Sequence, residues 1–305
     1  MAQGPESKEA HEIILDASES EQYWETKLVV ELNRLLLDGK KCLRILVTGR
    51  TGAGKSALVN SIVGEYVADE GDLPQGQTTK VKRYDKTVGD VEIWIYDSPG
   101  LQDGINNKRV EEKYLEDLQK NCREVDLNLF CVKMNDKMRE SETDAIVKLS
   151  NSFGGDKFWQ NTLIVLTFAN EVRPPRSSNV TPVDFFSKSM SDWKPLLQDK
   201  LISKAQITEK VVENIPIVPA GYSDEPSLPA ANCDYWLSDL WFKCLDHTKD
   251  IGMPILLTLN LDRLRPTDKV DPDIRKKKGY QQPIIPPATD KKAPSRAEEY
   301  FKKLW

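Results

Sequence analysis

An eight-residue glycine-rich segment constrains the fold of this chain more than any other part of its sequence. Residues 49–56 read G-R-T-G-A-G-K-S, directly after an apolar run and at the start of a helix-like stretch. Such a P-loop joins a strand to a helix, and its glycines let backbone N–H groups point at phosphate oxygens. We therefore expect an α/β fold with phosphate contacts from Thr51, Gly52, Ala53, Gly54, Lys55, Ser56 and Ala57.

Three side chains are candidates for the chemistry at this loop. Lys55 is expected to reach the β- and γ-phosphates, and Ser56 to bind Mg²⁺ through its hydroxyl. Asp97 ends the apolar run V-E-I-W-I-Y-D, where its carboxylate can hold the magnesium through water. The pattern predicts a nucleotide site with bound Mg²⁺.

The residues after Asp97 favour a switch protein. Ser98 stands where many ATPases place a glutamate that activates water, and Gly100 completes a D-x-x-G pattern. The N–H of such a glycine contacts the γ-phosphate and releases it when that phosphate leaves. Thr78 and Thr79 precede the next strand. By its position we prefer Thr79 as the second switch residue, binding Mg²⁺ and the γ-phosphate, so Lys55, Thr79 and Gly100 are the predicted catalytic set.

Apolar runs of strand length alternate with amphipathic stretches along the middle of the chain. The expected strands are residues 42–49, 91–97, 127–134, 163–169 and 215–221, and the expected helices are 105–122, 141–153 and 181–201. This alternation predicts a mostly parallel sheet with helices on both faces. The segment before residue 91 has room only for a strand over 80–88, so those two strands should form an antiparallel pair.

The ends of the chain differ from the middle. We expect an N-terminal extension over 1–40 with an amphipathic helix over 19–38, a P-loop domain over 41–260 and a tail over 261–305. The tail has 12 Lys and Arg against 7 Asp and Glu and is rich in proline, which is typical of an extended linker. Its last residues, Tyr300 to Trp305, either dock on a partner or on this domain, or are solvated.

The motifs "GRTGAGKSALVNSIVG", "QTTK" and "DSPGLQDG" resemble those of the translation-factor-related class of G proteins. Within that class they look like the septin-related subgroup of immunity-associated nucleotide-binding proteins and chloroplast outer-envelope import receptors, over roughly residues 41–250. The resemblance implies a Ras-like G domain that binds GTP or GDP with Mg²⁺. It also implies that a homodimer can form through the nucleotide face.

Several residues depart from the pattern of small GTPases. Asn170, in "TFAN", stands where an aspartate would accept two hydrogen bonds from guanine, so it either reads the base less strictly or only closes a turn. Ala220 is a candidate to bring its N–H to the guanine oxygen. Leu101 replaces a glutamine that orients water, Gln102 lies one residue off, and Thr51 replaces a glycine. The substitutions at Leu101 and Thr51 predict slow hydrolysis by the monomer unless Arg50 or a partner chain assists.

We therefore expect a guanine-nucleotide switch that hydrolyses GTP slowly and controls self-association or the binding of an unidentified protein partner. A nucleotide-binding scaffold without turnover and a P-loop ATPase remain alternatives. The acidic first 260 residues argue against nucleic acid as a partner, and no apolar run is long enough to cross a membrane. The expected location is the cytoplasm.

Overall fold

The computed structural model describes residues 42–63, 67–68, 81–88, 91–101, 108–122 and 125–221, together with 227–231, 233, 236–237, 239–240, 243–244 and 247. The helix expected over 19–38, the loop residues Thr78, Thr79 and Gln102, and the tail over 261–305 lie outside the described residues. The division of the chain into an extension, a domain and a tail therefore stays a prediction.

A six-stranded sheet organises the described part of the chain, with the strand order β2-β3-β1-β4-β5-β6. Strands β2 and β3 are antiparallel and all other neighbours are parallel, which confirms the predicted mixed sheet. The strands are β1 (Cys42–Gly49), β2 (Lys82–Val88), β3 (Val91–Asp97), β4 (Leu127–Lys133), β5 (Thr162–Thr167) and β6 (Ile217–Pro219).

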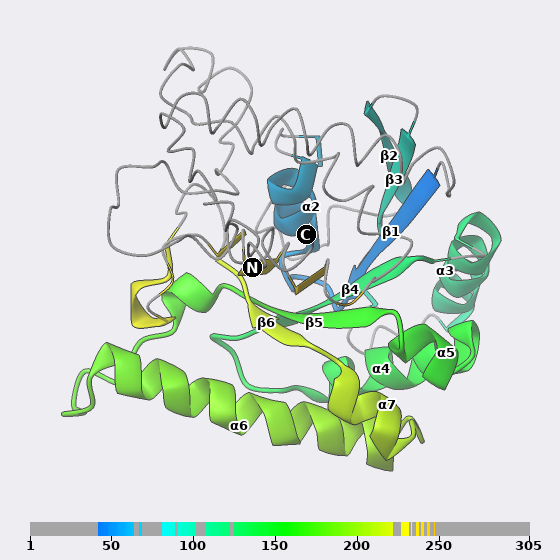
Figure 1. The fold of residues 1–305 in the computed structure, drawn as a ribbon. Helices are drawn as coiled ribbons and strands as arrows, with labels where there is room; N and C mark the ends of the chain where they lie inside the picture. Colours follow the sequence, from blue (N-terminus) through cyan, green and yellow to red (C-terminus); the bar gives the residue numbers. More distant parts are fainter. Residues whose placement is uncertain are drawn as a thin grey trace, which may run out of the picture.

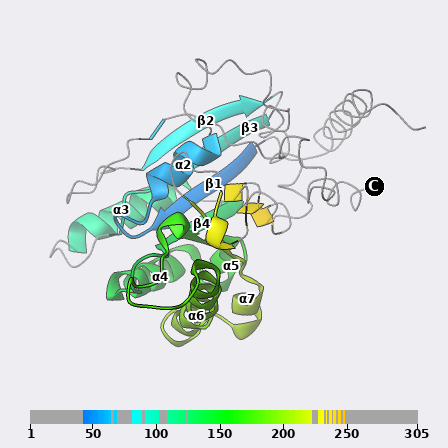
Figure 2. The ribbon, with the colours of Figure 1, turned by 90° about the vertical axis from the view of Figure 1, so that its left-hand side faces the viewer.

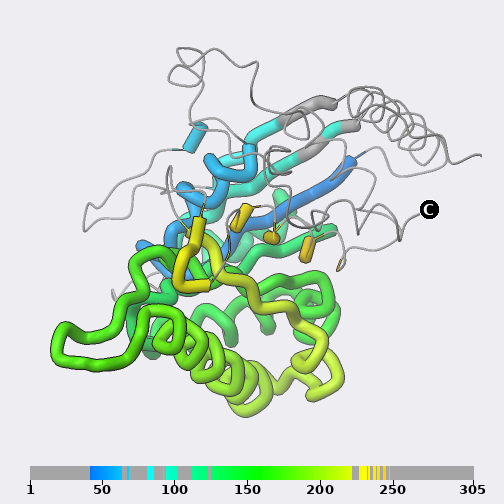
Figure 3. The backbone as a smooth tube through the Cα atoms, turned by 60° about the vertical axis from the view of Figure 1, so that its left-hand side comes forward, coloured from blue at the N-terminus to red at the C-terminus, as the bar shows by residue number. Residues whose placement is uncertain are grey.

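Helices cover both faces of this sheet, as the sequence pattern predicts. Helix α2 lies on one face, and α4, α5, α6 and α7 lie on the other (Figures 1 and 2). The α-helices are α2 (Lys55–Val63), α3 (Lys108–Asn121), α4 (Glu140–Phe153), α5 (Asp156–Trp159), α6 (Pro182–Ser203) and α7 (Glu209–Asn214), and two short 3₁₀ turns are η1 (Ala169–Glu171) and η2 (Pro229–Ala231). Figure 3 shows that the chain from β4 onward builds the thicker helical layer.

Strands β4 and β5 are almost completely buried. Every residue of β5 and all but the last residue of β4 are buried, as expected for parallel strands covered on both faces. Phe130 of β4 meets Trp159 edge to face, with ring centroids 5.4 Å apart. The Trp159 indole N–H donates to the Ser150 hydroxyl at 2.7 Å, so its polar atom is satisfied inside the core.

The short helices are the main difference from the predicted elements. Helices α5 and α7 have four and six residues, too few to show a helical period in the sequence. The predicted bounds of helix α6 agree with the structure within two residues at each end. Its N-terminus is defined by Thr181, the N-cap, whose hydroxyl accepts the Asp184 N–H at 3.1 Å. The strand expected over 215–221 is shorter in the structure, since only 217–219 pair as β6.

Candidate functional site: the loop after strand β1

The segment between β1 and α2 folds as a compact loop that is held by backbone hydrogen bonds. Gly52 and Gly54 have φ angles of 76° and 78°, in the left-handed region that favours glycine. The Ala53 N–H donates back to the Arg50 carbonyl at 3.3 Å, and the Leu58 N–H donates to the Gly54 carbonyl at 3.0 Å as α2 begins. Successive N–H groups in such a turn form a concave surface suited to an anion.

Three of the predicted side chains meet at this loop. Lys55 is nearly buried, and its ammonium donates to the Arg50 carbonyl at 2.9 Å. Burial lowers the pKa of Lys55, while the nearby charge of Asp97 opposes that shift. The Ser56 hydroxyl donates to a carboxylate oxygen of Asp97 at 2.9 Å, and Ala57 follows as the third residue of α2.

This donor set fits a magnesium ion. A hydroxyl and a carboxylate are hard oxygen ligands, which Mg²⁺ prefers, and the lysine beside them suits the phosphates that share such an ion. Asp97 has 1% of its surface exposed, so its charge is held in a largely dry environment next to Ser56. The roles of these residues toward a nucleotide stay predictions.

The segment after Asp97 returns to the loop and packs against it. A Cβ built on Gly100 would lie 2.2 Å from Thr51 Oγ1 and 2.3 Å from the Thr51 nitrogen and Cα, so only glycine fits there. Leu101 pairs with Arg50 as an extension of the sheet, and its N–H lies 3.4 Å from the Gly49 carbonyl. The Leu101 side chain is buried, so it packs in the core instead of facing a phosphate.

Thr167 and Phe168, at the end of β5, touch the glycine-rich loop. The Thr167 hydroxyl lies 2.8 Å from the Ala53 carbonyl oxygen and 3.2 Å from that of Val132. Phe168 has the left-handed angles φ 56° and ψ 29°, and a Cβ on Gly54 would lie 3.0 Å from its ring. Because a bulky residue is strained in this region, its conformation must be held by the surrounding contacts.

The two predicted base-reading groups have different surroundings. Asn170 is half-buried in η1, and its Oδ1 is buried without a hydrogen-bond partner among the described residues. An acceptor in this state fits a ligand donor such as the N1–H of guanine. Ala220 was expected to offer its N–H to the guanine oxygen, and this prediction is wrong. That N–H donates to the Leu166 carbonyl at 2.8 Å, and Ala220 is fully buried.

Arg50 is not free to assist a reaction, contrary to one expectation from the sequence. Its guanidinium donates to Glu142 of α4, to Asp136 at 3.0 Å and to the Thr51 carbonyl at 3.1 Å. Sequence reasoning missed Glu142. The only feature of Glu142 visible in the sequence was its acidic side chain in the first turn of a predicted helix, where such a residue is ordinarily interpreted as stabilising the helix N-terminus.

The strand order and the position of the loop opposite Asp97 are those of a Ras-like G domain in the P-loop class. A model of the AIG1 family matches residues 43–199, and the chain belongs to this family. The subgroup resemblance expected from the motifs is thereby confirmed.

Chloroplast translocases are among its curated relatives. Translocase of chloroplast 125 from Physcomitrium patens is 30% identical over 207 residues, which cover 66% of this chain but 18% of the relative. Translocase of chloroplast 33 from Arabidopsis thaliana is 28% identical over 225 residues, covering 70% of this chain and 72% of the relative. The larger relatives extend far beyond the matched region.

The described fold is that of the solved Arabidopsis thaliana protein Toc33. The crystal structure of Toc33 in complex with GDP and Mg²⁺ superposes with a TM-score of 0.60 at 23% identity, over 74% of this chain and 93% of that one. Its complex with Mg²⁺ and GMPPNP gives a TM-score of 0.57 at 22% identity, over 77% and 92%. At this identity the likeness shows the fold.

The relatives also correct the expected location. Proteins named as chloroplastic translocases of chloroplast match this chain, so the inference of a plain cytoplasmic protein is wrong. Among the described residues, no helix has the length and apolar character needed to span a membrane.

Proposed function

We propose that this chain is a guanine-nucleotide switch that binds GTP and GDP with Mg²⁺ and hydrolyses GTP slowly. The observation that carries the proposal is the meeting of Ser56 and Asp97 at 2.9 Å beside the buried Lys55, at the first turn of α2. Membership of the AIG1 family and the nucleotide complexes of Toc33 support it. The proposed domain spans 41–260, with an extension before it and a tail after it.

Each residue of the site has a distinct task in this proposal. The N–H groups of Gly52 to Ser56 bind phosphate oxygens, and Lys55 compensates their charge. Ser56 and Asp97 hold Mg²⁺, which neutralises charge on the phosphates, and Thr79 joins them in the triphosphate state. Gly100 senses the γ-phosphate. Asn170 accepts a hydrogen bond from the base. The proposed catalytic set, which acts on the γ-phosphate, is Lys55, Thr79 and Gly100.

Slow turnover in the isolated chain follows from two observations. Leu101 is buried where a water-orienting glutamine would stand, and Arg50 is held by Glu142 and Asp136. Acceleration then requires a group from another chain, which can be worth about 10³–10⁵ in rate. In the related proteins Toc33 and psToc159, dimerization is described as important for GTPase activity. We extend this to a nucleotide-dependent homodimer or protein complex of the present chain.

Calorimetric titration of nucleotide-free protein with GTP, GDP and ATP in Mg²⁺ tests the assignment. Lys55→Ala should abolish binding, and Lys194→Ala, which removes an exposed lysine from α6, should leave it unchanged. GTP and GDP are expected to bind more tightly than ATP. Equal binding of ATP would favour a P-loop ATPase, an alternative that Asn170 keeps open, and the absence of binding would refute the proposal.

Phosphate release then separates a switch from a scaffold without turnover. Single-turnover release from bound GTP should be slow at low protein concentration and faster at high concentration if a second chain assists. A rate that is measurable but independent of concentration would contradict self-association. Bound GTP that is never hydrolysed would support the scaffold, which the buried Leu101 favours.

A further inference from the structure

The side chain of Arg50 links the phosphate-binding loop to helix α4. Its surface is 7% exposed, and three nitrogens of the guanidinium each donate to an oxygen. Nε donates to Glu142 Oε1, Nη2 to Asp136 Oδ2 at 3.0 Å, and Nη1 to the Thr51 carbonyl at 3.1 Å. Because an arginine fork fixes direction as well as distance, these contacts set the orientation of the loop at Arg50 and Thr51.

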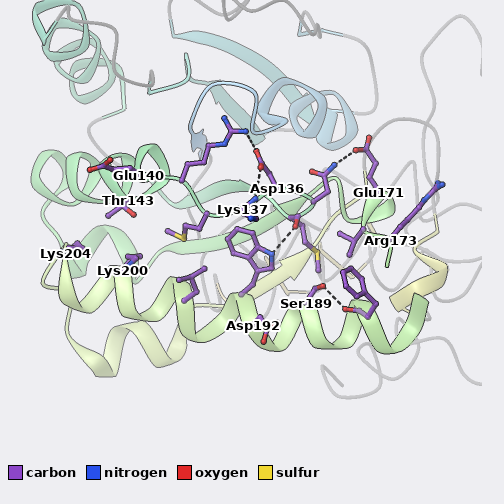
Figure 4. A pocket seen from close by; sticks show the side chains of 18 residues that line it. Asp136, Lys137, Glu140, Thr143, Glu171, Arg173, Ser189, Asp192, Lys200 and Lys204 are labelled. Atoms are coloured by element: carbon purple, nitrogen blue, oxygen red, sulfur yellow. Dashed lines mark hydrogen bonds and ion pairs between the residues drawn. The ribbon is translucent and has the colours of Figure 1, made fainter. Parts of the chain in front are cut away.

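Both carboxylates that hold Arg50 are themselves fixed. Glu142 is 1% exposed, and its second oxygen accepts the Arg139 N–H at 2.8 Å at the start of α4. Asp136 accepts the Lys137 N–H at 2.8 Å and a guanidinium N–H of Arg139 at 2.6 Å. Figure 4 shows Asp136 at the edge of a groove that α6 closes on the other side. The first turn of α4 and the segment before it therefore hold Arg50 through two carboxylates that have hydrogen-bond partners of their own.

The main chain of Arg50 serves the proposed nucleotide site directly. Its carbonyl accepts the Lys55 ammonium at 2.9 Å and the Ala53 N–H at 3.3 Å. Arg50 also pairs with Leu101, and the next residue, Thr51, is in contact with Gly100. A single residue thus connects Glu142 to the lysine of the loop and to the segment that follows Asp97.

We propose that Glu142 is a positioning residue for the nucleotide site, acting through Arg50 on the side of the loop that faces Gly100. The inference rests on the proposed function, and it goes further by assigning the difference between the triphosphate and diphosphate states to a residue outside the loop. The glycine of a D-x-x-G segment meets the γ-phosphate, which GDP lacks. A loop displaced at Thr51 should therefore lose affinity for the triphosphate more than for GDP.

Calorimetry with GDP and with the non-hydrolysable analogue GMPPNP measures this discrimination. Glu142→Gln keeps the shape of the side chain and removes its charge. The ratio of GMPPNP to GDP affinity is expected to fall about tenfold, which corresponds to one charge-assisted hydrogen bond, while GDP affinity stays within about threefold. Glu140→Gln is the matched control, since it removes an exposed charge from the same helical turn.

A double-mutant cycle tests whether Glu142 acts through Arg50. Arg50→Lys keeps the charge but cannot reproduce the three contacts of the guanidinium, so it should lower the same ratio of GMPPNP to GDP affinity. Because it keeps the positive charge, it also serves as the test variant if Glu142→Gln fails to fold. The double variant should be no worse than the more impaired single variant, because both disturb one contact. A general structural role would instead lower the affinities for both nucleotides together.

Each result has a definite reading. Suppose that wild-type protein binds GDP, and that Glu142→Gln and Arg50→Lys both leave the ratio of GMPPNP to GDP affinity unchanged. This result would overturn the positioning role of Glu142 and leave the proposed function standing. Fully additive effects in the cycle would also overturn it. Wild-type protein that binds neither nucleotide would instead refute the proposed function itself.

Discussion

Replacing Asn170 by aspartate should restore strict recognition of guanine. The guanine edge carries two donors, N1–H and the 2-amino group, and a carboxylate accepts from both, whereas an amide has one acceptor and one donor group. Oδ1 of Asn170 is buried without a partner among the described residues, so it is available to N1–H. The other polar atom of this amide is a donor nitrogen, so no second acceptor atom stands beside Oδ1 for the 2-amino group.

The expected size of the effect follows from this count. A hydrogen bond to a charged group is worth about 1.5–3 kcal/mol, and 1.4 kcal/mol is a factor of ten in affinity. Inosine diphosphate lacks the 2-amino group but keeps N1–H. Wild-type protein should therefore bind GDP and IDP almost equally, and Asn170→Asp should favour GDP over IDP by about 10- to 100-fold.

Calorimetry with GDP and IDP under identical Mg²⁺ and salt gives this ratio directly. Asn151→Asp introduces the same charge at an exposed position of α4 and should leave the ratio unchanged. An Asn170→Asp variant that is folded and binds both nucleotides with the wild-type ratio would refute the reasoning. In that case Asn170 only closes the turn after β5, the alternative that its sequence context left open.

Three further predictions concern the loop and the core. Ser56→Ala should lower GDP affinity about tenfold in Mg²⁺ but hardly at all in EDTA, while Ser61→Ala, in the same helix, should change neither value, as calorimetry would show. Gly100→Ala should leave GDP binding intact and weaken GMPPNP binding, because its Cβ would lie 2.3 Å from the Thr51 backbone and displace the segment; equal losses for both nucleotides would contradict this. Burial raises the pKa of the Cys131 thiol from 9.0 to about 12, so its stabilising contribution is complete below pH 9 and is lost as pH rises toward 12. Urea unfolding from pH 9 to 11 should show wild-type protein losing about 1.4 kcal/mol per pH unit relative to Cys131→Ala, and parallel curves would count against it.

The parts of the fold that the sequence predicts are those defined by contiguous residues. The loop over 49–56, the strand that ends at Asp97 and the antiparallel pair β2–β3 all follow from local spacing and from the lack of room for a second helix. Thr79 and the two ends of the chain lie outside the described residues, so those expectations remain as they were.

The expectations that failed depend on contacts between distant residues. The N–H of Ala220 is directed by the register between β5 and β6, which pairs Leu166 with Pro219 and leaves that N–H opposite the Leu166 carbonyl. Arg50 and Glu142 are 92 residues apart in the sequence, so no local pattern shows that the two side chains form an ion pair. The contact of Glu142 with Arg50 was missed because an acidic residue in the first turn of a helix has a sufficient local explanation.

The contact between the end of β5 and the glycine-rich loop has a consequence for the shape of ligand that the site admits. The Thr167 hydroxyl lies 2.8 Å from the Ala53 carbonyl oxygen, and a Cβ on Gly54 would lie 3.0 Å from the Phe168 ring, closer than an ordinary van der Waals contact. The proposed base-binding segment after β5 and the proposed phosphate-binding loop are therefore in direct contact. If both bind one nucleotide, their separation is set by this contact, and we expect the site to reject a nucleotide with a longer or shorter sugar linker even when base and phosphates are unchanged.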